Sequence, residues 1–355
     1  MNKMVKQRFD IRLFLAVGLT LTGFLVTITS FTRVYKTHFY LPYPEAQTIS
    51  SEISSKQETT FIAVGDIMLS RNVARHAEKW WSNMWMWDNI LSYLKSADFV
   101  FGNLEGPTNG TNIYSYQQVL TFNALPALIR TLPDVWFRMI NLANNHALDQ
   151  EVEGLEITKV LLREIGVEFT GVGQNKEEAW EPKIIEHNGI KIAFIGASYA
   201  SYNDNGSRTS PYIARMQESI KLIESLEKAK KNADIVIVTM HAGAEYTLKT
   251  TPLQEEFAHA AIDHGADMVI WAHPHWVQPI ERYNGKYIFY SLGNFVFDQE
   301  FSIETKSGLT LKITLEKTPE TSVVKTIELL PIIIDNYGQP RLATNEEKKT
   351  ILERI

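Results

Sequence analysis

Two histidines, His273 and His275, flank a single proline at the end of the apolar run ADMVIWAHPHW. Imidazole nitrogens are common metal ligands, so this pair predicts one edge of a metal site whose other ligands come from elsewhere in the chain. Further residues that bind metals also stand at the ends of apolar runs. These residues are Asp66, Glu105, Asn145, His146 and His241.

Each of these residues also has an ordinary structural explanation. A lone Asp66 after glycine is typical of a turn, Glu105 could begin a loop, His146 could cap a helix, and His241 could be a loop histidine with satisfied hydrogen bonds. Their joint occurrence favours metal binding. Oxygen and nitrogen ligands without sulfur suit Mn, Zn or Fe, and ligands on several loops suit one or two divalent ions.

The elements that must position these residues form an α/β pattern. Continuous apolar runs predict strands buried on both faces, and they alternate with helical stretches. The predicted strands cover 61–66, 97–105, 137–146, 190–198, 234–243, 267–275 and 286–295, and the predicted helices cover 151–166, 214–233 and 252–265. The carboxyl ends of parallel strands meet at one edge of a sheet, where sites are usually built. Two later strand-like runs, 307–317 and 322–334, are predicted to pair antiparallel at a sheet edge.

Composition excludes several classes of protein. The 355 residues contain no cysteine, so disulfides, thiolate metal sites and thiol nucleophiles are excluded. The net charge of −6 argues against nonspecific binding to nucleic acid. A hydrophobic content of 45% is that of a globular protein.

The N-terminus predicts a membrane anchor. Basic residues dominate 1–12, and residues 13–31 form 19 consecutive uncharged residues, enough to span about 30 Å of hydrocarbon as a helix. The basic flank predicts a single-pass protein with a cytoplasmic N-terminus and an extracellular main domain at the cell membrane. Cleavage of this segment as a signal peptide is the alternative.

Domain boundaries follow from these patterns. Residues 1–12 are predicted to be a cytoplasmic tail and 13–31 a signal anchor. Residues 32–57 are rich in Pro, Ser, Thr and Glu and are predicted to be a linker. The folded domain is predicted at 58–335, with a C-terminal tail at 336–355.

The order of short motifs resembles the calcineurin-like metallophosphoesterases, and more narrowly their CapA-type branch, which takes part in poly-γ-glutamate capsule synthesis. The resemblance covers about residues 60–300, and its motifs are VGDIMLSR, FGNLEGP, NLANNHALD, TGVGQN, HAGAEY, AHPHWVQPIE and YSLGNFVFDQ. It implies a four-layer α/β/β/α sandwich with a two-metal centre at the strand ends.

The resemblance also implies a role for each candidate residue. Asp66 matches the first aspartate ligand, and Glu105 the aspartate that bridges the two metals. Asn145 matches the amide ligand, and His146 the histidine that protonates a leaving group. The histidine ligands of the family correspond to His241, His273 and His275.

Two departures from the family pattern put activity in doubt. Met68 stands where the phosphoesterases usually have a histidine ligand, and a thioether is a poor ligand for a hard ion. Glu105 is one methylene longer than the usual aspartate. Glu245, four residues after His241, is a candidate for the missing ligand, and Arg71 is a candidate for contact with an anionic substrate.

The resemblance implies a membrane-anchored protein of poly-γ-glutamate elongation or export. Its implied partners are integral-membrane synthase subunits and the polymer or another anionic substrate, without nucleic acid. Catalysis would be metal-dependent hydrolysis in which Asp66 and His146 take part. Two alternatives stay open, namely a non-catalytic assembly or polymer-guiding subunit and a metal-dependent phosphodiesterase.

Overall fold

The computed structural model describes residues 56–80, 82–112, 121–199 and 210–355. The predicted cytoplasmic tail, the predicted anchor at 13–31 and almost all of the predicted linker lie outside these residues. Within the described part of the chain, no helix combines the length and the hydropathy that crossing a membrane requires.

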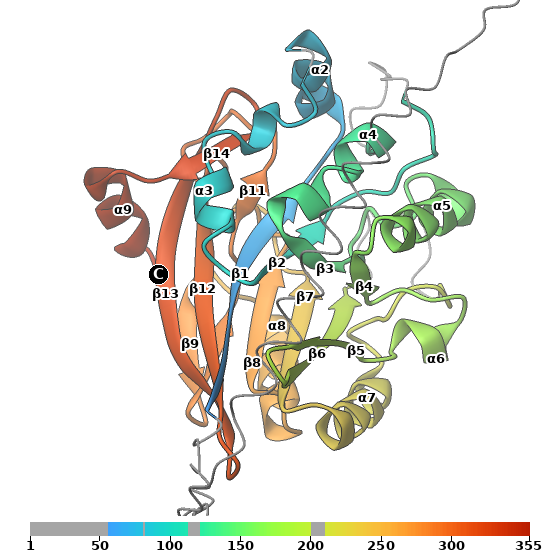
Figure 1. The fold of residues 1–355 in the computed structure, drawn as a ribbon, viewed down its shortest axis with the longest axis vertical. Helices are drawn as coiled ribbons and strands as arrows, with labels where there is room; N and C mark the ends of the chain where they lie inside the picture. Colours follow the sequence, from blue (N-terminus) through green and yellow to red (C-terminus); the bar gives the residue numbers. More distant parts are fainter. Residues whose placement is uncertain (1–55, 81, 113–120, 200–209) are drawn as a thin grey trace, which may run out of the picture. The chain divides into compact units, whose positions relative to one another are not determined.

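The first sheet has eight strands. They are β1 (Gln57–Ile67), β2 (Phe99–Leu104), β3 (Phe137–Asn141), β4 (Glu168–Thr170), β11 (Asn294–Val296), β12 (Ser307–Lys317), β13 (Ser322–Asp335) and β14 (Gln339–Leu342). Their order is β14–β13–β12–β1–β2–β3–β4, and β11 pairs with β1. Strands β1 to β4 run parallel, whereas β12 pairs antiparallel with both β1 and β13 (Figure 1).

The second sheet has six strands. They are β5 (Lys183–His187), β6 (Ile190–Ser198), β7 (Ile235–His241), β8 (Met268–Ala272), β9 (Ile280–Tyr283) and β10 (Lys286–Phe289). Their order is β5–β6–β7–β8–β10–β9, with β6, β7, β8 and β10 parallel. Parallel strands are buried on both faces, which explains their continuous apolar sequences.

The two sheets pack face to face through a shared apolar core. Phe61 of β1 stacks on Phe99 of β2 at a centroid distance of 5.2 Å, and its ring meets Phe194 of β6 edge-on at 6.2 Å. Phe101 of β2 also contacts Phe194, at 5.0 Å. Because these rings come from both sheets, they fix how the strand ends of one sheet face those of the other.

Helices cover the outer faces of the sheets. The first sheet packs against α2 (Arg71–Lys79), α3 (Leu91–Leu94), α4 (Pro126–Ile129) and α5 (Glu151–Glu164), and the second against α6 (Lys176–Ala179), α7 (Ser219–Asn232) and α8 (Pro252–Asp263). Two short 3₁₀ helices, η1 (Trp85–Trp87) and η2 (Leu132–Val135), complete the cover of the first sheet. Helix α8 begins with a capping box between Thr251 and Gln254, with Pro252 at its first position.

The predicted mixed α/β fold is confirmed, and it contains two sheets. The helices predicted at 151–166 and 252–265 correspond to α5 and α8, whereas the one predicted from residue 214 begins only at Ser219. The strand predicted at 286–295 is divided into β10 and β11, because Gly293 adopts a φ of 67° between them. The antiparallel pairing predicted for the last two runs is confirmed by β12 and β13.

The segment 336–355, predicted to be a tail, is folded. It contains β14, which pairs with β13, and α9 (Asn345–Leu352), which begins with a capping box between Thr344 and Glu347. Ile351 of α9 is buried in the core that the two sheets share. Few apolar residues occur in this segment, so its sequence gives only a weak signal for structure.

Candidate metal centre

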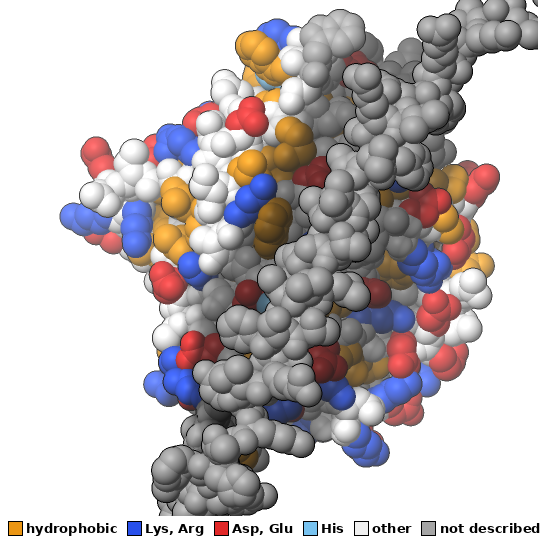
Figure 2. All heavy atoms as spheres, viewed as in Figure 1, with side chains coloured by type: hydrophobic (Ala, Val, Ile, Leu, Met, Phe, Trp, Pro, Cys, Tyr) orange, Lys and Arg blue, Asp and Glu red, His pale blue; other side chains and the backbone are white. Residues whose placement is uncertain are grey.

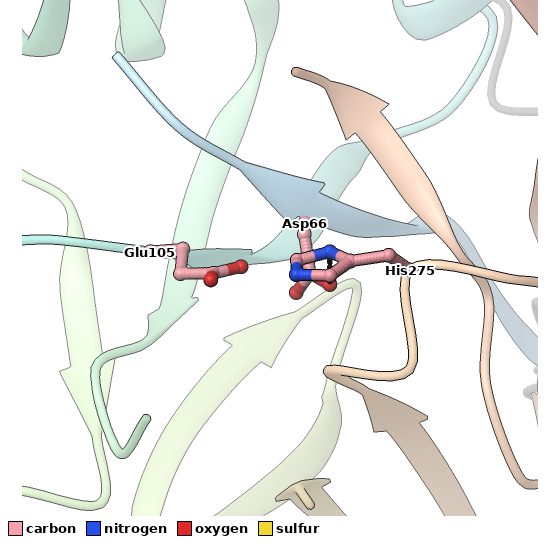
Figure 3. Close-up of side chains that lie close together, drawn as sticks. All are labelled: Asp66, Glu105 and His275. Atoms are coloured by element: carbon pink, nitrogen blue, oxygen red, sulfur yellow. Dashed lines mark ion pairs between the residues drawn. The ribbon is translucent and has the colours of Figure 1, made fainter. Parts of the chain in front are cut away.

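Three donors from different strands meet at the carboxyl ends of the sheets. Asp66 projects from β1, Glu105 from the segment after β2, and His275 from the loop after β8, and the three side chains point toward one another (Figure 3). One ligand atom from each lies within 4.8 Å of the others, and all three residues are buried. We refer to Asp66, Glu105 and His275 as the carboxylate triad.

A second set of donors adjoins the first. The Nε2 atom of His241 lies 2.8 Å from Oδ1 of Asn145 and 3.1 Å from Nδ1 of His273. Donor atoms about 3 Å apart are spaced as ligands around one ion with bonds of about 2.1 Å. We refer to Asn145, His241 and His273 as the amide triad.

Asp66 joins the two triads. Its Oδ2 accepts a hydrogen bond from the backbone N–H of His273 at 3.1 Å and lies 3.6 Å from Nδ1 of His275. Its Oδ1 lies 3.6 Å from Nδ1 of His241. The structure therefore brings together all six residues that the sequence proposes as metal ligands.

The carboxylate of Glu105 provides a test of whether this group fits a cation. Glu105 is 1% exposed, and neither of its oxygens has a hydrogen-bond partner among the described residues. A buried carboxylate without partners is costly, so most such groups are paired or bind metal. The donor set and this unsatisfied carboxylate both fit a divalent cation.

Burial favours the uncharged forms of the carboxyl groups and imidazoles at this centre. Burial raises the pKa of Glu105 well above its usual value, and the Asp66 carboxylate raises it further. Burial also raises the pKa of Asp66, although His275 opposes this shift. Burial lowers the pKa of His273 and His275 to about 3, and that of His241 well below its usual value. A neutral imidazole has one nitrogen with a lone pair that a metal can use, and a cation would stabilise the ionised carboxylates.

His146 lies beside Glu105 and is held from two sides. Its Nδ1 lies 2.7 Å from Oδ2 of Asp149, and its Nε2 lies 3.7 Å from Oε1 of Glu105. The ring of Phe122 stacks on the imidazole at 3.9 Å with an interplanar angle of 19°. The contact with Asp149 places a proton on Nδ1 and directs Nε2 toward the carboxylate triad.

Arg71 stands at the rim of the group. Its guanidinium pairs with Asp298 and lies 4.8 Å from the ring centroid of Phe122 and 5.4 Å from that of Phe297. Phe297 in turn meets His275 edge-on at 4.8 Å. Arg71 thus reaches the rings that pack on both His146 and His275.

Glu245 does not join the donors that meet within 4.8 Å. It is partly exposed and its carboxylate interacts with the hydroxyl of Tyr246, whose ring stacks on His275 at 5.8 Å. Met68 has other contacts. It is fully buried in the apolar core outside the first sheet, and its sulfur accepts hydrogen bonds from N and Oγ of Ser70 at 3.2 and 3.0 Å.

Backbone geometry also marks this region. His273 and His275 have φ angles of 106° and 59°, and Arg71 and Tyr246 have φ angles of 46° and 57°. Non-glycine residues with positive φ are uncommon and concentrate at functional sites.

Sequence reasoning missed several residues of the centre. Asn103 donates from Nδ2 to Oδ1 of Asp66 at 2.8 Å, and Asn294 contacts Nδ1 of His275 through its Oδ1 at 2.9 Å. Asp149 had a usable signal, because it follows His146 by three residues in NNHALD. Asn103 and Asn294 lie in the motifs FGNLEGP and YSLGNFVFDQ, but their roles depend on how their amides are oriented in the folded protein.

The chain is similar to two capsule synthesis proteins of Bacillus. The chain is 33% identical over 320 residues to the PGA biosynthesis protein CapA of Bacillus subtilis, covering 88% of this chain and 80% of that protein. It is 30% identical over 306 residues to the capsule biosynthesis protein CapA of Bacillus anthracis, covering 84% of this chain and 72% of that protein.

Two more distant likenesses were found. A probable polyglutamine synthesis accessory protein of Mycobacterium tuberculosis is 25% identical over 289 residues, or 76% of each protein. A crystal structure of the calcineurin-like phosphoesterase YfkN from Bacillus subtilis aligns with a TM-score of 0.48 at 15% identity, covering 84% of this chain and 96% of that structure. Residues 60–299 match the family described as bacterial capsule synthesis protein PGA_cap, and the chain belongs to that family.

Proposed function

We propose that this chain is a membrane-anchored, outward-facing protein of poly-γ-glutamate capsule biosynthesis that acts as a metal-dependent hydrolase during polymer elongation or export. Membership of the capsule synthesis family and the names of the two CapA relatives support the process. In this proposal, the two sheets and their outer helices form the four-layer sandwich of the metallophosphoesterases.

The observation that carries the catalytic part is Glu105. Its buried carboxylate has no hydrogen-bond partner among the described residues and faces Asp66 and His275. A structural role would not require this arrangement, because a buried carboxylate that only fills space is destabilising. A bound cation would satisfy it.

The residues of the centre would have separate roles. The carboxylate and amide triads would hold one or two divalent ions, which supply electrophilic polarisation of the bond to be cleaved. Asp149 and Phe122 hold the imidazole of His146. In its doubly protonated form, with the Nδ1 proton on Asp149, this side chain would give its Nε2 proton to the leaving atom and become neutral. Arg71 contacts an anionic group of the substrate at the rim. The bond cleaved is a phosphoryl or an amide bond.

The first test measures metal in the purified full-length protein by elemental mass spectrometry, beside a His273→Ala/His275→Ala variant. We expect one or two ions per chain in the wild type and their loss in the variant. Release of fragments from poly-γ-glutamate, in the wild type but not in His146→Gln, would then support the hydrolase. A wild type that holds no metal while it remains folded would exclude it.

A non-catalytic assembly or polymer-guiding subunit is the second candidate. Met68 favours it, because this side chain packs in the core and leaves the carboxylate triad without the usual imidazole. The word accessory in the name of the Mycobacterium tuberculosis relative is consistent with it. Metal binding without cleavage of polymer, together with copurification of membrane synthase subunits, would support this candidate. Cleavage of generic phosphodiesters would instead support a phosphodiesterase.

The proposed location is the outer face of the cell membrane, with residues 1–12 in the cytoplasm. Its support is the sequence alone, in the uncharged segment 13–31 that follows a basic cluster. Protease treatment of intact protoplasts should cut the predicted linker at 32–57, release the main domain and leave a short N-terminal fragment in the membrane. A main domain that is protected until the membrane is lysed would contradict the proposed orientation.

A further inference from the structure

A chain of amides links the backbone to the metal centre. Asn141 donates from Nδ2 to the carbonyl of Ala143 at 2.9 Å and accepts from the N–H of Ala143 at 3.3 Å. Asn144 donates from Nδ2 to the carbonyl of Leu104 at 2.8 Å and accepts from the N–H of His146 at 3.1 Å. Because each amide contacts both a backbone donor and a backbone acceptor, neither can be turned over.

These two amides fix the orientation of Asn103. Both Nδ2 atoms, of Asn141 and of Asn144, donate to Oδ1 of Asn103, at 3.0 and 3.4 Å. The Nδ2 of Asn103 must then face the centre, where it donates to Oδ1 of Asp66 at 2.8 Å and lies 3.1 Å from Nδ1 of His241. A nitrogen that accepts from an amide N–H carries a lone pair, so the proton of neutral His241 resides on Nε2.

This tautomer is unfavourable for metal binding. The Nε2 atom of His241 is the one that faces Asn145 and His273, and its proton satisfies Oδ1 of Asn145 at 2.8 Å. An ion at the amide triad needs a lone pair on this Nε2. If the proton moved to Nδ1 of His241, two hydrogen-bond donors would face each other there, namely this N–H and the amide N–H of Asn103.

The contacts of His275 favour the opposite tautomer, with the proton on Nδ1. The Nδ2 of Asn294 donates to Oε1 of Gln299 at 3.0 Å and to the carbonyl of Thr305 at 2.9 Å. Its Oδ1 therefore faces Nδ1 of His275, at 2.9 Å, and the proton of His275 resides on that nitrogen. The Nε2 of His275 keeps its lone pair for an ion at the carboxylate triad.

From these contacts we propose that the two triads load unequally, and that Asn103 is the positioning residue that keeps the amide triad weak. The carboxylate triad supplies two carboxylates and an imidazole in the binding tautomer. The amide triad supplies three neutral donors, one of which is in the opposing tautomer. The inference rests on the proposed function, because it concerns the ions that this function requires.

The test is a titration of Mn²⁺ into the chelator-stripped full-length protein, followed by calorimetry. We expect one tight and one weak ion in the wild type. Asn103→Asp provides an acceptor for an Nδ1 proton on His241 and a further negative charge. This variant should bind the second ion about 10- to 100-fold more tightly, the range in which changes around metal ligands act. Such a gain cannot result from damage to the fold.

Three further variants assign the two ions and control for charge. Asn123→Asp adds the same charge on the partly buried side chain whose Oδ1 accepts from the N–H of Asn109 at 2.8 Å, and it should leave both affinities unchanged. His275→Ala should remove the tight ion and His273→Ala the weak one. Two equal affinities in the wild type, or no gain in Asn103→Asp, would overturn the inference while leaving the proposed function intact. A wild type that binds no Mn²⁺ at all would overturn both.

Discussion

At the scale of single residues, Glu105 combines full burial with an unsatisfied carboxylate, and this combination has a measurable cost in the metal-free protein. Its pKa is raised in the folded state, so the folded state binds more protons than the unfolded state above the usual glutamate pKa of about 4.3. The free energy of unfolding therefore falls as the pH rises through and above this value.

Glu105→Gln should remove this loss. We expect the metal-free variant to be more stable than the metal-free wild type at pH 8 by about 1–3 kcal/mol, because the amide stays buried but no longer ionises. Urea unfolding of both proteins, with and without Mn²⁺, checks this. In the presence of Mn²⁺ the order should reverse, because only the wild type gains stability by binding the ion. A variant that is less stable without metal would contradict this account.

The histidines of the centre should make the free energy of unfolding fall at acid pH. The pKa of His273 and His275 is about 3 in the folded protein, against about 6.5 when unfolded. Their contribution to stability is therefore fully present above about pH 6.5 and is lost as the pH falls toward 3. In the metal-free His273→Gln/His275→Gln variant, stability should depend less steeply on pH across this window. Unfolding curves between pH 4 and 7 measure the slope, and an unchanged slope would show that these imidazoles are not buried.

Asp149 should matter for turnover more than for folding. Its carboxylate orients His146, so Asp149→Asn should reduce the rate of hydrolysis by about 10²- to 10⁴-fold, the usual contribution of a positioned acid. His146→Gln should cause a loss of similar size, and the double variant should be no worse than either single one. Steady-state rates at equal metal content test this, and additive losses would show that the two residues act separately.

At the scale of elements, the close approach of β1 and β11 positions Asp66. A Cβ atom on Gly65 would lie 1.9 Å from the carbonyl oxygen of Gly293, which belongs to the backbone and cannot move aside. Gly65→Ala should therefore destabilise the protein by about 1–3 kcal/mol or more, as overpacked sites do, and should weaken Mn²⁺ binding. Gly166→Ala is the control for metal binding, because a Cβ there has no neighbour within 4 Å and the substitution strains only the local backbone, whose φ is 71°. Equal effects of the two substitutions on metal affinity would contradict the role of β11.

The sequence predicts these elements better than their details. His241 and His273 could be placed at one rim because continuous apolar runs indicate parallel strands, and parallel strands share an edge. Asp66 lies on the other sheet, and only the family resemblance implied that the two rims meet. The division of residues 286–295 into two strands could not be predicted, because it depends on where β1 leaves room for β11. The contribution of Asn103 could not be predicted either, because an amide has donor and acceptor ends that only its neighbours distinguish.

At the scale of the whole molecule, the net charge gives no general attraction to a polyanion. Lysines and arginines are interspersed with aspartates and glutamates over the visible described face (Figure 2), and the net charge of the chain is −6. In the proposed function, recognition of an acidic polymer would therefore depend on local groups such as Arg71 and the metal centre. Its dependence on ionic strength should be shallower than that of proteins that bind polyanions through a basic surface.

The pairing of β1 with β12 has a consequence for biosynthesis. Gln57 at the start of β1 pairs with Lys317 at the end of β12. The strand that carries Asp66 therefore cannot complete its pairing until residues more than 200 positions later have been synthesised. Until then, one edge of β1 is open and able to pair with other chains. We expect nascent chains that end before residue 307 to be digested readily by protease and to aggregate, whereas release of the complete chain should bring resistance in one step. If the chain were exported before its synthesis is complete, this open edge would be exposed at the cell exterior. A slower synthesis would then leave more chains to aggregate or be degraded.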